Sequence, residues 1–350
     1  MSISQTHKAL VAHEIGGALV AIDVPTYSPG QGELLVKAHS VALNPADWKI
    51  HRNRVMDHYP VIFGFDMAGE VVQVGEGVEG FSVGDRIFGQ TTVTANRRAG
   101  FQQYLIKDAA TAAKIPEDVS YDEAGTLPLG FATAITGLYA EFPHGAGLTP
   151  PFTRDTEGKY TGQPIVVLGG SSSVGQATIQ AAQISGFSPI ITTASERHSN
   201  FLRTLGATHV LSRQLDRSTL RNAIKSIIGD KSIEVVYDAV SLEDTQKLGA
   251  SLLGKGGVLI LVLNSKLTPK ESRDVKLAAA YASFTEPWNV VLLRKAFQEK
   301  LNGWLKDDRI KPNNYEILPD GLGGISGGLQ RMADNQVSAA KLLAHPQETP

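Results

Sequence analysis

A turn rich in glycine and serine follows a short apolar run in the middle of the chain. Ile165 to Leu168 is too short for a helix and rich in β-branched residues, which is typical of a buried strand. Gly169, Gly170 and three serines follow, and a helical apolar pattern begins near Gly175. Glycines let the backbone approach a ligand closely, and free N–H groups at a helix N-terminus bind phosphate. The predicted pyrophosphate ligands are Gly170, Ser171, Ser172, Ser173 and Val174.

The end of the next expected strand, Pro189 to Thr193, bears on which nucleotide binds. An acidic residue about 20 residues beyond the glycine turn binds the ribose 2′-hydroxyl of NAD. Here that position falls on Ala194 or Ser195, and Arg197 and His198 follow. A hydroxyl and cations suit a 2′-phosphate, so we expect NADP(H). A carboxylate of Glu196 turned inward would favour NAD instead.

These residues belong to a strand–helix–strand unit, and the pattern continues after it. Apolar runs at 234–240 and 257–263 alternate with helical segments at 218–228 and 242–253. Such alternation predicts a parallel, doubly wound α/β sheet of the Rossmann type. Residues 1–125 form instead a succession of short strand-like runs broken by Gly and Pro, which predicts a bent β-rich domain.

We therefore expect a β-rich domain at 1–125, a cofactor-binding domain at 126–280 and a C-terminal return at 281–350. Ser120 with Glu123 predicts a capping box at the start of one helical region that reaches Leu138. Further helices are expected at 200–205, 288–305 and 326–334, and a closing strand or turn at 337–343.

Composition limits the classes of function. The 350 residues carry a formal net charge of -2, which favours neither a nucleic-acid nor a membrane-surface partner. No apolar run is long enough for a transmembrane helix, and we expect a soluble, cytoplasmic protein. Cysteine is absent, which removes disulfides, thiolate nucleophiles and Cys-ligated zinc, and the nine histidines lack paired helical spacing. No metal site is predicted.

The motif order resembles the medium-chain dehydrogenase/reductase superfamily, whose fold pairs a GroES-like β domain with a Rossmann domain. The motifs are NPADWK (44–49), GFDMAGEVVQVG (64–75), GEGVEGFSVGDRIFG (75–89), LPLGFATAITGLY (127–139), GGSSSVGQ (169–176) and LGATHV (205–210). They span nearly the whole chain. Among known members the chain is most similar to fungal trans-acting enoyl reductases of polyketide synthesis and to quinone-oxidoreductase relatives.

The resemblance also implies a zinc-free enzyme. Zinc alcohol dehydrogenases have Cys where this chain has Asn44, and His-Glu where it has Phe65 and Asp66. Zinc-free members reduce activated double bonds or quinones with NADPH. We expect Asp66 to cap backbone N–H groups.

Residue by residue, the resemblance places further cofactor contacts outside the glycine turn. The expected positions are Ala46, Asp47, Trp48, Lys49, Thr133, Ser195, Arg197, His198, Arg213, Leu263, Asn264, Val337 and Ser338. Of these, Lys49 is our candidate catalytic residue, because its ammonium group suits the carbonyl oxygen on which negative charge develops during enone reduction. A ribose hydroxyl of the cofactor is the alternative donor.

The expected function is an NADPH-dependent oxidoreductase that reduces a C=C bond conjugated to a carbonyl. Its substrate would be a small enone, an enoyl thioester or a quinone, since an NADPH quinone oxidoreductase is the alternative on the same fold. A non-catalytic NADPH sensor or scaffold is the alternative from another class. A polyketide synthase is the possible partner, and the protein would be a monomer or a homodimer.

Overall fold

The computed structural model describes residues 3–54, 56–284 and 286–350, which form two compact units. The first unit comprises residues 1–129 and 312–350, and the second comprises residues 130–311. The C-terminal return to the first unit therefore begins at Pro312, later than the residue 281 expected from the sequence. Residues 281–284 and 286–311 belong instead to the second unit, where Phe284 and Phe131 both contact the buried ring of Phe297.

The first unit is built on two sheets. One has the strand order β15-β16-β3-β5-β6-β8, with β7 also paired to β3, and the other has the order β2-β1-β4. Most pairs are antiparallel. The β-rich domain predicted for residues 1–125 lies within this unit. The strands are β1 (Thr6–Ala12), β2 (Leu19–Pro25), β3 (Glu33–Ala42), β4 (Val61–Ile62), β5 (Asp66–Val74), β6 (Arg86–Gln90), β7 (Tyr104–Asp108), β8 (Ala113–Lys114), β15 (Tyr315–Ile317) and β16 (Lys341–Ala344).

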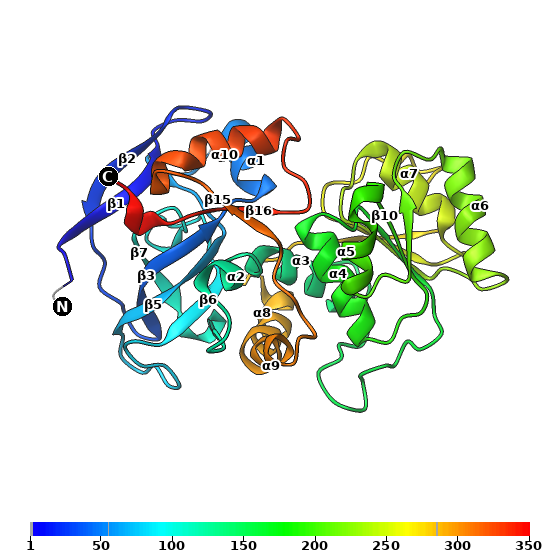
Figure 1. Cartoon of the computed structure of the whole chain (residues 1–350), viewed down its shortest axis with the longest axis horizontal. Helices are drawn as coiled ribbons and strands as arrows, with labels where there is room; N and C mark the ends of the chain where they lie inside the picture. Colours follow the sequence, from blue (N-terminus) through cyan, green and yellow to red (C-terminus); the bar gives the residue numbers. More distant parts are fainter. Residues whose placement is uncertain (1–2, 55, 285) are drawn as a thin grey trace. The chain divides into compact units, whose positions relative to one another are not determined.

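The C-terminal return completes the core of the first unit. Leu318, Leu322, Leu329 and Leu342 are buried in the same apolar cluster as residues of β1, β3 and β5. Helix α10 (Ile325–Ala333) lies beside α1 (Pro45–Asn53) (Figure 1). The N-terminal and C-terminal parts of the chain therefore share one core.

The second unit contains a parallel sheet with the order β11-β10-β9-β12-β13-β14. Its strands are β9 (Ile165–Leu168), β10 (Ile190–Ala194), β11 (His209–Ser212), β12 (Val235–Asp238), β13 (Val258–Leu261) and β14 (Lys276–Ala279). Along the chain, β10 and β11 are added on one side of β9, and β12, β13 and β14 are added on its other side. The direction in which the sheet grows therefore reverses at β9. In such sheets, ligands bind beyond the carboxyl ends of the strands at this reversal.

Helices cover both faces of this sheet (Figure 1). Helix α4 (Ser173–Ile184) and α5 (Ser199–Thr204) lie on one side, and α6 (Arg217–Ile228) and α7 (Glu243–Leu252) lie on the other. Leu220, Ile224 and Leu248 of α6 and α7 pack on Val166 and Val236 of the central strands. This arrangement confirms the predicted doubly wound α/β fold.

Several elements differ from the sequence-based expectation. The helical region after Ser120 is two helices, α2 (Tyr121–Gly125) and α3 (Pro128–Tyr139), with the predicted capping box at Ser120. Proline at position 128 begins the second helix, which explains the break. The expected helix at 288–305 consists of α8 (Pro287–Arg294), a π-helical stretch (Lys295–Leu301) and α9 (Asn302–Lys306). Helix α1 and the strand β14 were not predicted.

Within the described residues, no helix has the length and apolar character that crossing a bilayer requires.

A buried tyrosine fixes α3 against the parallel sheet. Tyr237 of β12 is fully buried, and its hydroxyl donates to the Thr133 carbonyl at 2.8 Å. The ring passes over Gly137, where a Cβ would lie 2.6 Å from the nearest ring carbon and 2.9 Å from Ile260. Glycine is therefore required at this close approach for steric reasons.

We predict that Gly137→Ala lowers the free energy of unfolding by about 1–3 kcal/mol, because the buried ring has no space into which it can move. Gly303→Ala in α9 is the matched control, since nothing lies within 4 Å of its Cβ position. Alanine there should stabilise the helix by up to about 1 kcal/mol. Urea unfolding followed by circular dichroism measures both. Equal stability of the two variants would contradict the packing described.

Candidate functional site

The glycine turn brings the start of α4 against β9 and β10. Gly169 has a φ of +78°, which favours glycine. A Cβ on Gly170 would collide with the Thr192 hydroxyl, and one on Gly175 would lie 2.7 Å from the Gly170 Cα. The turn therefore depends on all three glycines, and it holds the helix N-terminus at the carboxyl end of β9.

Three backbone N–H groups of this turn are available for a ligand. Ser172 is the N-cap of α4, and its hydroxyl accepts from the Gly175 N–H at 3.0 Å. The N–H groups of Ser171, Ser173 and Val174 have no acceptor within the described part of the chain. The positive end of the helix dipole lies at the same place. Such donors suit an anion such as a pyrophosphate. The N–H groups of Gly170 and Ser172, which were also predicted to bind it, already donate to the carbonyls of Thr193 and Gly169 at 3.0 Å.

The hydroxyl of Ser173 has a different position from that of Ser172. The Ser173 Oγ is buried beside Gly130 of α3 and has no hydrogen-bond partner among the residues that the structure describes. The capping function, which either serine could have supplied, belongs to Ser172 alone.

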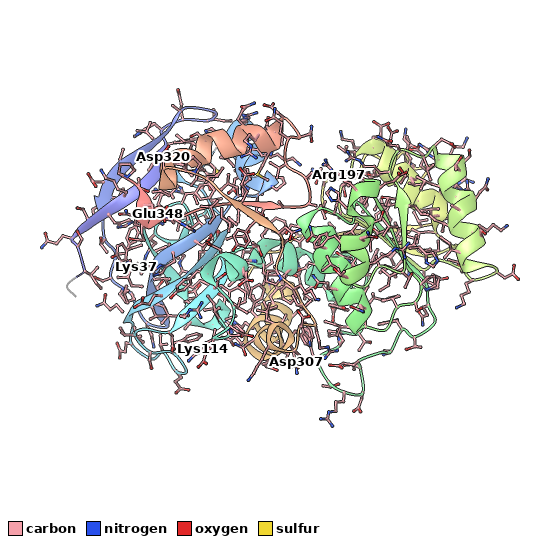
Figure 2. All side chains as sticks on the ribbon, viewed as in Figure 1. Lys37, Lys114, Arg197, Asp307, Asp320 and Glu348 are labelled. Atoms are coloured by element: carbon pink, nitrogen blue, oxygen red, sulfur yellow. The ribbon has the colours of Figure 1, made fainter. Side chains whose placement is uncertain are left out.

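The residues expected at the 2′-phosphate lie together after β10 and β11. The side-chain Nε of Arg197 donates to His198 Nε2 at 3.2 Å. The backbone N–H of Arg213 donates to the Ala194 carbonyl at 2.9 Å. Partial burial lowers the pKa of His198, and the charges of Arg197 and Arg213 lower it further. Figure 2 shows Arg197 at the surface of the second unit, where its guanidinium is exposed. Ser195 precedes this cluster.

The carboxyl ends of β12 and β13 form a second group of ordered turns. The buried Asp238 carboxylate accepts the Val240 and Ser241 N–H groups at 3.1 and 2.8 Å, and burial raises the pKa of Asp238. Gln246 Nε2 donates to the Asn264 carbonyl at 3.1 Å. Leu263 and Asn264, both predicted contacts, are exposed in the loop that this bond holds. Thr133 is buried on α3 in the same unit.

In the first unit, Ala46, Asp47, Trp48 and Lys49 form the first half of α1. Proline 45 occupies the first turn, and the Asp47 carboxylate accepts the Asn44 N–H at 2.7 Å. The Nζ atom of Lys49 lies 5.6 Å from the centroid of the Trp48 ring, and Lys49 forms no ion pair within the described chain. Partial burial lowers the pKa of Lys49. Because no carboxylate within the described chain pairs with it, the ammonium group of Lys49 can donate hydrogen bonds to a ligand.

A buried polar cluster lies directly before α1. Lys341 Nζ of β16 donates to Asp66 Oδ2 of β5 at 2.7 Å and to Asn44 Oδ1 at 2.6 Å. Asn44 Nδ2 donates to the same Asp66 oxygen at 2.8 Å. Asp66 Oδ1 accepts the Leu129 N–H at the start of α3 at 2.6 Å, so the predicted capping function of Asp66 is present. All three side chains are at most 4% exposed.

Asp47 adds a second buried carboxyl group to this region. Its side chain is fully buried and also accepts the Gly64 N–H at 3.0 Å. Burial raises the pKa of Asp47 to about 7, and the charge of Asp66 acts in the same direction. The two backbone N–H donors and Lys341 oppose that rise. Val337 and Ser338 lie in the same unit, in the segment that leads from α10 to β16.

This donor set does not fit zinc. Asp66 already binds an ammonium and an amide, Asn44 offers only a weakly basic amide oxygen, and Lys341 is itself a cation. Nitrogen and sulfur donors dominate zinc sites in proteins. Across the described residues, no group of three His, Cys, Asp or Glu side chains is placed to hold a metal ion.

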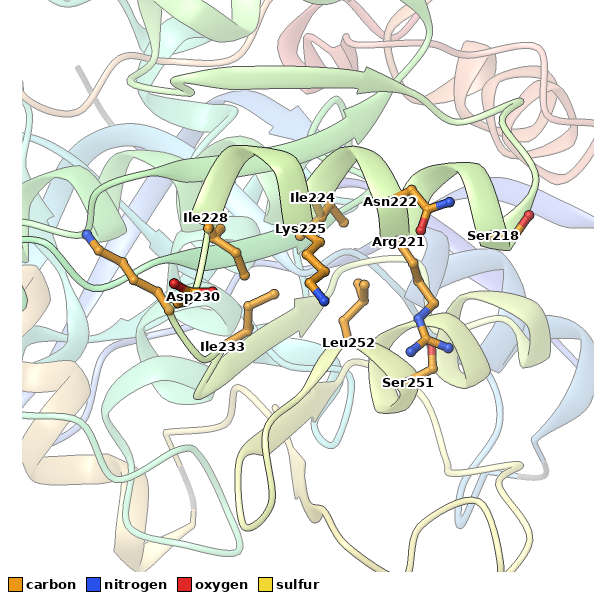
Figure 3. Close-up of a pocket in the computed structure, with 12 residues that line it drawn as sticks. Ser218, Arg221, Asn222, Ile224, Lys225, Ile228, Asp230, Ile233, Ser251 and Leu252 are labelled. Atoms are coloured by element: carbon orange, nitrogen blue, oxygen red, sulfur yellow. The ribbon is translucent and has the colours of Figure 1, made fainter.

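A hollow of about 550 Å³ lies elsewhere on the second unit, between α6 and the end of α7. Figure 3 shows Arg221 and Lys225 projecting from α6 toward Ser251 and Leu252. The hollow runs along α6 from Ser218 to Gly229 and reaches Ile233, which precedes β12. Its lining residues are separate from those of the glycine turn, and the two features are therefore distinct.

Lys341 is the residue of the buried cluster that sequence reasoning missed. It stands in the apolar strand KLLA, where a lysine has no nearby acid in the sequence. The available signal was a charged residue at a position that the strand pattern requires to be buried, since lysine is rarely buried without a partner.

Sequence comparison identifies two families along the chain. Residues 30–117 match the alcohol dehydrogenase GroES-like domain, and residues 173–279 match the zinc-binding dehydrogenase family. Trans-enoyl reductase himH of Aspergillus japonicus is 32% identical, over 89% of each chain. Trans-enoyl reductase resD of Aspergillus sclerotiorum is 29% identical, over 96% of this chain and 99% of the relative.

Solved structures show the same fold. An alcohol dehydrogenase superfamily protein from Novosphingobium aromaticivorans has a TM-score of 0.79 at 22% identity, covering 96% of this chain and 98% of its own. Its likeness extends over both units. Together with the identity to himH, these matches show that the chain belongs to the medium-chain dehydrogenase/reductase superfamily.

Proposed function

We propose that the protein is an NADPH-dependent enoyl reductase that works without a metal ion. The main support is the identity of 29% and 32% to two proteins named trans-enoyl reductase, over most of the length of every chain compared. The glycine turn of the second unit supports a dinucleotide, because its free N–H groups face no acceptor within the described residues.

Positive charge after β10 supports NADPH over NADH. Arg197 and the hydroxyl of Ser195 occur where an NAD-selective site has an acid, and Arg213 follows the neighbouring strand β11. The remaining acid, Glu196, is exposed and forms no ion pair within the described chain. A dianionic 2′-phosphate gains charge-assisted hydrogen bonds in such surroundings.

Lys49 is the proposed donor to the substrate. Bound NADPH supplies a hydride to the β-carbon of the conjugated double bond, and negative charge moves to the carbonyl oxygen. A donor at that oxygen accelerates the reaction when it binds the developing enolate more strongly than the ground state. Lys49 has no competing carboxylate among the described residues, and its surroundings are partly desolvated, which strengthens such a bond. Protonation of the enolate at the α-carbon then completes the reduction, and water is a sufficient source of that proton.

We further propose a polyketide synthase as the partner. This proposal rests on the resemblance of the sequence motifs to fungal trans-acting enoyl reductases of polyketide synthesis, and two relatives are named trans-enoyl reductase. We also propose a cytoplasmic protein that is a monomer or a homodimer. An NADPH quinone oxidoreductase is the alternative function, and a non-catalytic NADPH-binding protein is the second.

We predict that an enoyl thioester or a simple enone supports NADPH oxidation, and that Lys49→Met lowers kcat roughly 100-fold because one donor to the enolate is lost. Arg52→Met is the matched control, since Arg52 lies at the same 5.6 Å from the Trp48 ring centroid. Its kcat should stay within about twofold of the wild type. Absorbance at the NADPH band measures the rates.

The same assay includes a quinone. Faster turnover of the quinone than of either unsaturated carbonyl compound would favour the alternative enzyme. Tight NADPH binding without oxidation by any acceptor would favour the non-catalytic protein. Unchanged kinetics of Lys49→Met would remove Lys49 from the mechanism.

For the nucleotide preference, we predict that Arg197→Ala raises the Kd for NADPH about tenfold, because a charged hydrogen bond to the 2′-phosphate is lost. The Kd for NADH should change less than twofold. Lys225→Ala in the distant hollow is the control and should affect neither value. Fluorescence titration provides the measurement, and equal weakening of both nucleotides would show that the 2′-phosphate binds elsewhere.

A further inference from the structure

The buried cluster of Lys341, Asn44 and Asp66 links four separate segments of the first unit. Lys341 comes from β16, Asp66 begins β5, Asn44 is the N-cap of α1, and Leu129 belongs to the first turn of α3. Each bond within the cluster is between 2.6 and 2.8 Å long. Because these segments are far apart in sequence, the cluster fixes their relative positions.

Charge balance makes Lys341 the central member. Lys341 is 4% exposed, and Asp66 and Asp47 are both fully buried. A carboxylate buried without a counter-charge costs far more than its pair with an ammonium contributes. Lys341 is the cation that faces these two carboxyls in the described structure. Without it, at least one of them must bind a proton or leave the core.

Lys341 also determines how Asn44 is oriented. The ammonium can only donate, so it selects the Asn44 amide oxygen and directs the amide nitrogen to Asp66. Asn44 in turn presents its backbone N–H to Asp47 in the first turn of α1. The chain of contacts thus runs from Lys341 to the helix that contains Lys49.

We propose that Lys341 is a positioning residue, an internal cation that orients the first turns of α1 and α3 at a position where zinc-containing members of this fold have metal ligands. Lys341 performs this function by fixing Asp66 and Asn44, not by contact with a substrate. The part of the proposal that concerns Lys49 rests on the proposed enoyl reductase function.

Thermal melting tests the charge balance independently of activity. Lys341→Met keeps the length of the side chain and removes its charge, so it should lower the Tm by roughly 10 °C at pH 8. Lys8→Met is the matched control, because the Lys8–Asp23 pair in the same unit is 3.2 Å long and exposed. Its Tm should change by less than about 2 °C.

The pH dependence distinguishes charge from packing. In Lys341→Met, the buried Asp47 loses the charge of Lys341 that opposes the rise of its pKa, so the folded-state pKa of Asp47 rises further above the unfolded value. A carboxyl group with a raised pKa binds more protons in the folded state, and stability then falls as pH rises. The Tm deficit relative to the wild type should therefore be larger at pH 8 than at pH 5. A deficit independent of pH would overturn the proposal.

Adding Asp66→Asn to Lys341→Met removes the uncompensated carboxylate. The double variant should regain at least half of the lost Tm, and at 15 °C it should regain part of any loss in kcat. Recovery of kcat identifies a positioning effect through Asp66, whereas a direct contact of Lys341 with the substrate would give no recovery. Purely additive Tm effects would contradict the coupling. If the wild type oxidises no NADPH, the proposed function fails, and the melting measurements still decide the function of Lys341.

Discussion

The close approach of α4 to β9 and β10 is the constraint on which the second unit depends. Three glycines permit it, because a Cβ at Gly170 or Gly175 would occupy space already filled by Thr192 or by the turn itself, and Gly169 has a positive φ. The helix N-terminus is thereby held at the carboxyl end of β9, next to the reversal of strand order. The free N–H groups, the arginines after β10 and β11 and the capped turns after β12 and β13 all lie at carboxyl ends of this sheet.

In the first unit, the main constraint is the burial of charged side chains. Asp66 and Asp47 are fully buried, yet each carboxylate accepts backbone N–H groups, and Lys341 supplies a cation. Buried ionic groups are stable only when paired and hydrogen-bonded. The cluster therefore links the segments around α1 through ion pairing and hydrogen bonds among its own side chains.

Local signals predicted much of this structure from sequence. The unit from Ile165 to Ala194 and the capping box at Ser120 were predictable, because periodicity and cap residues act over a few positions. Helix α1 was missed because its sequence PADWKIHRN has little apolar periodicity, although Pro45 at the first turn is a favourable start. The ion pair of Lys341 with Asp66 spans 275 positions, so only the tertiary fold reveals it.

The central claim is that backbone N–H groups of the serine-containing turn bind the dinucleotide pyrophosphate. Ser173→Pro tests it most directly, since Ser173 is the first residue of α4, where proline is tolerated and only an N–H without an intrahelical partner is removed. Ser173→Ala, which keeps that N–H, is the control. Calorimetry should show both NADPH and NADH binding about tenfold more weakly to the proline variant than to the alanine variant, at nearly equal Tm. Equal affinity of the two variants, or a wild-type protein that binds neither nucleotide, would contradict the account.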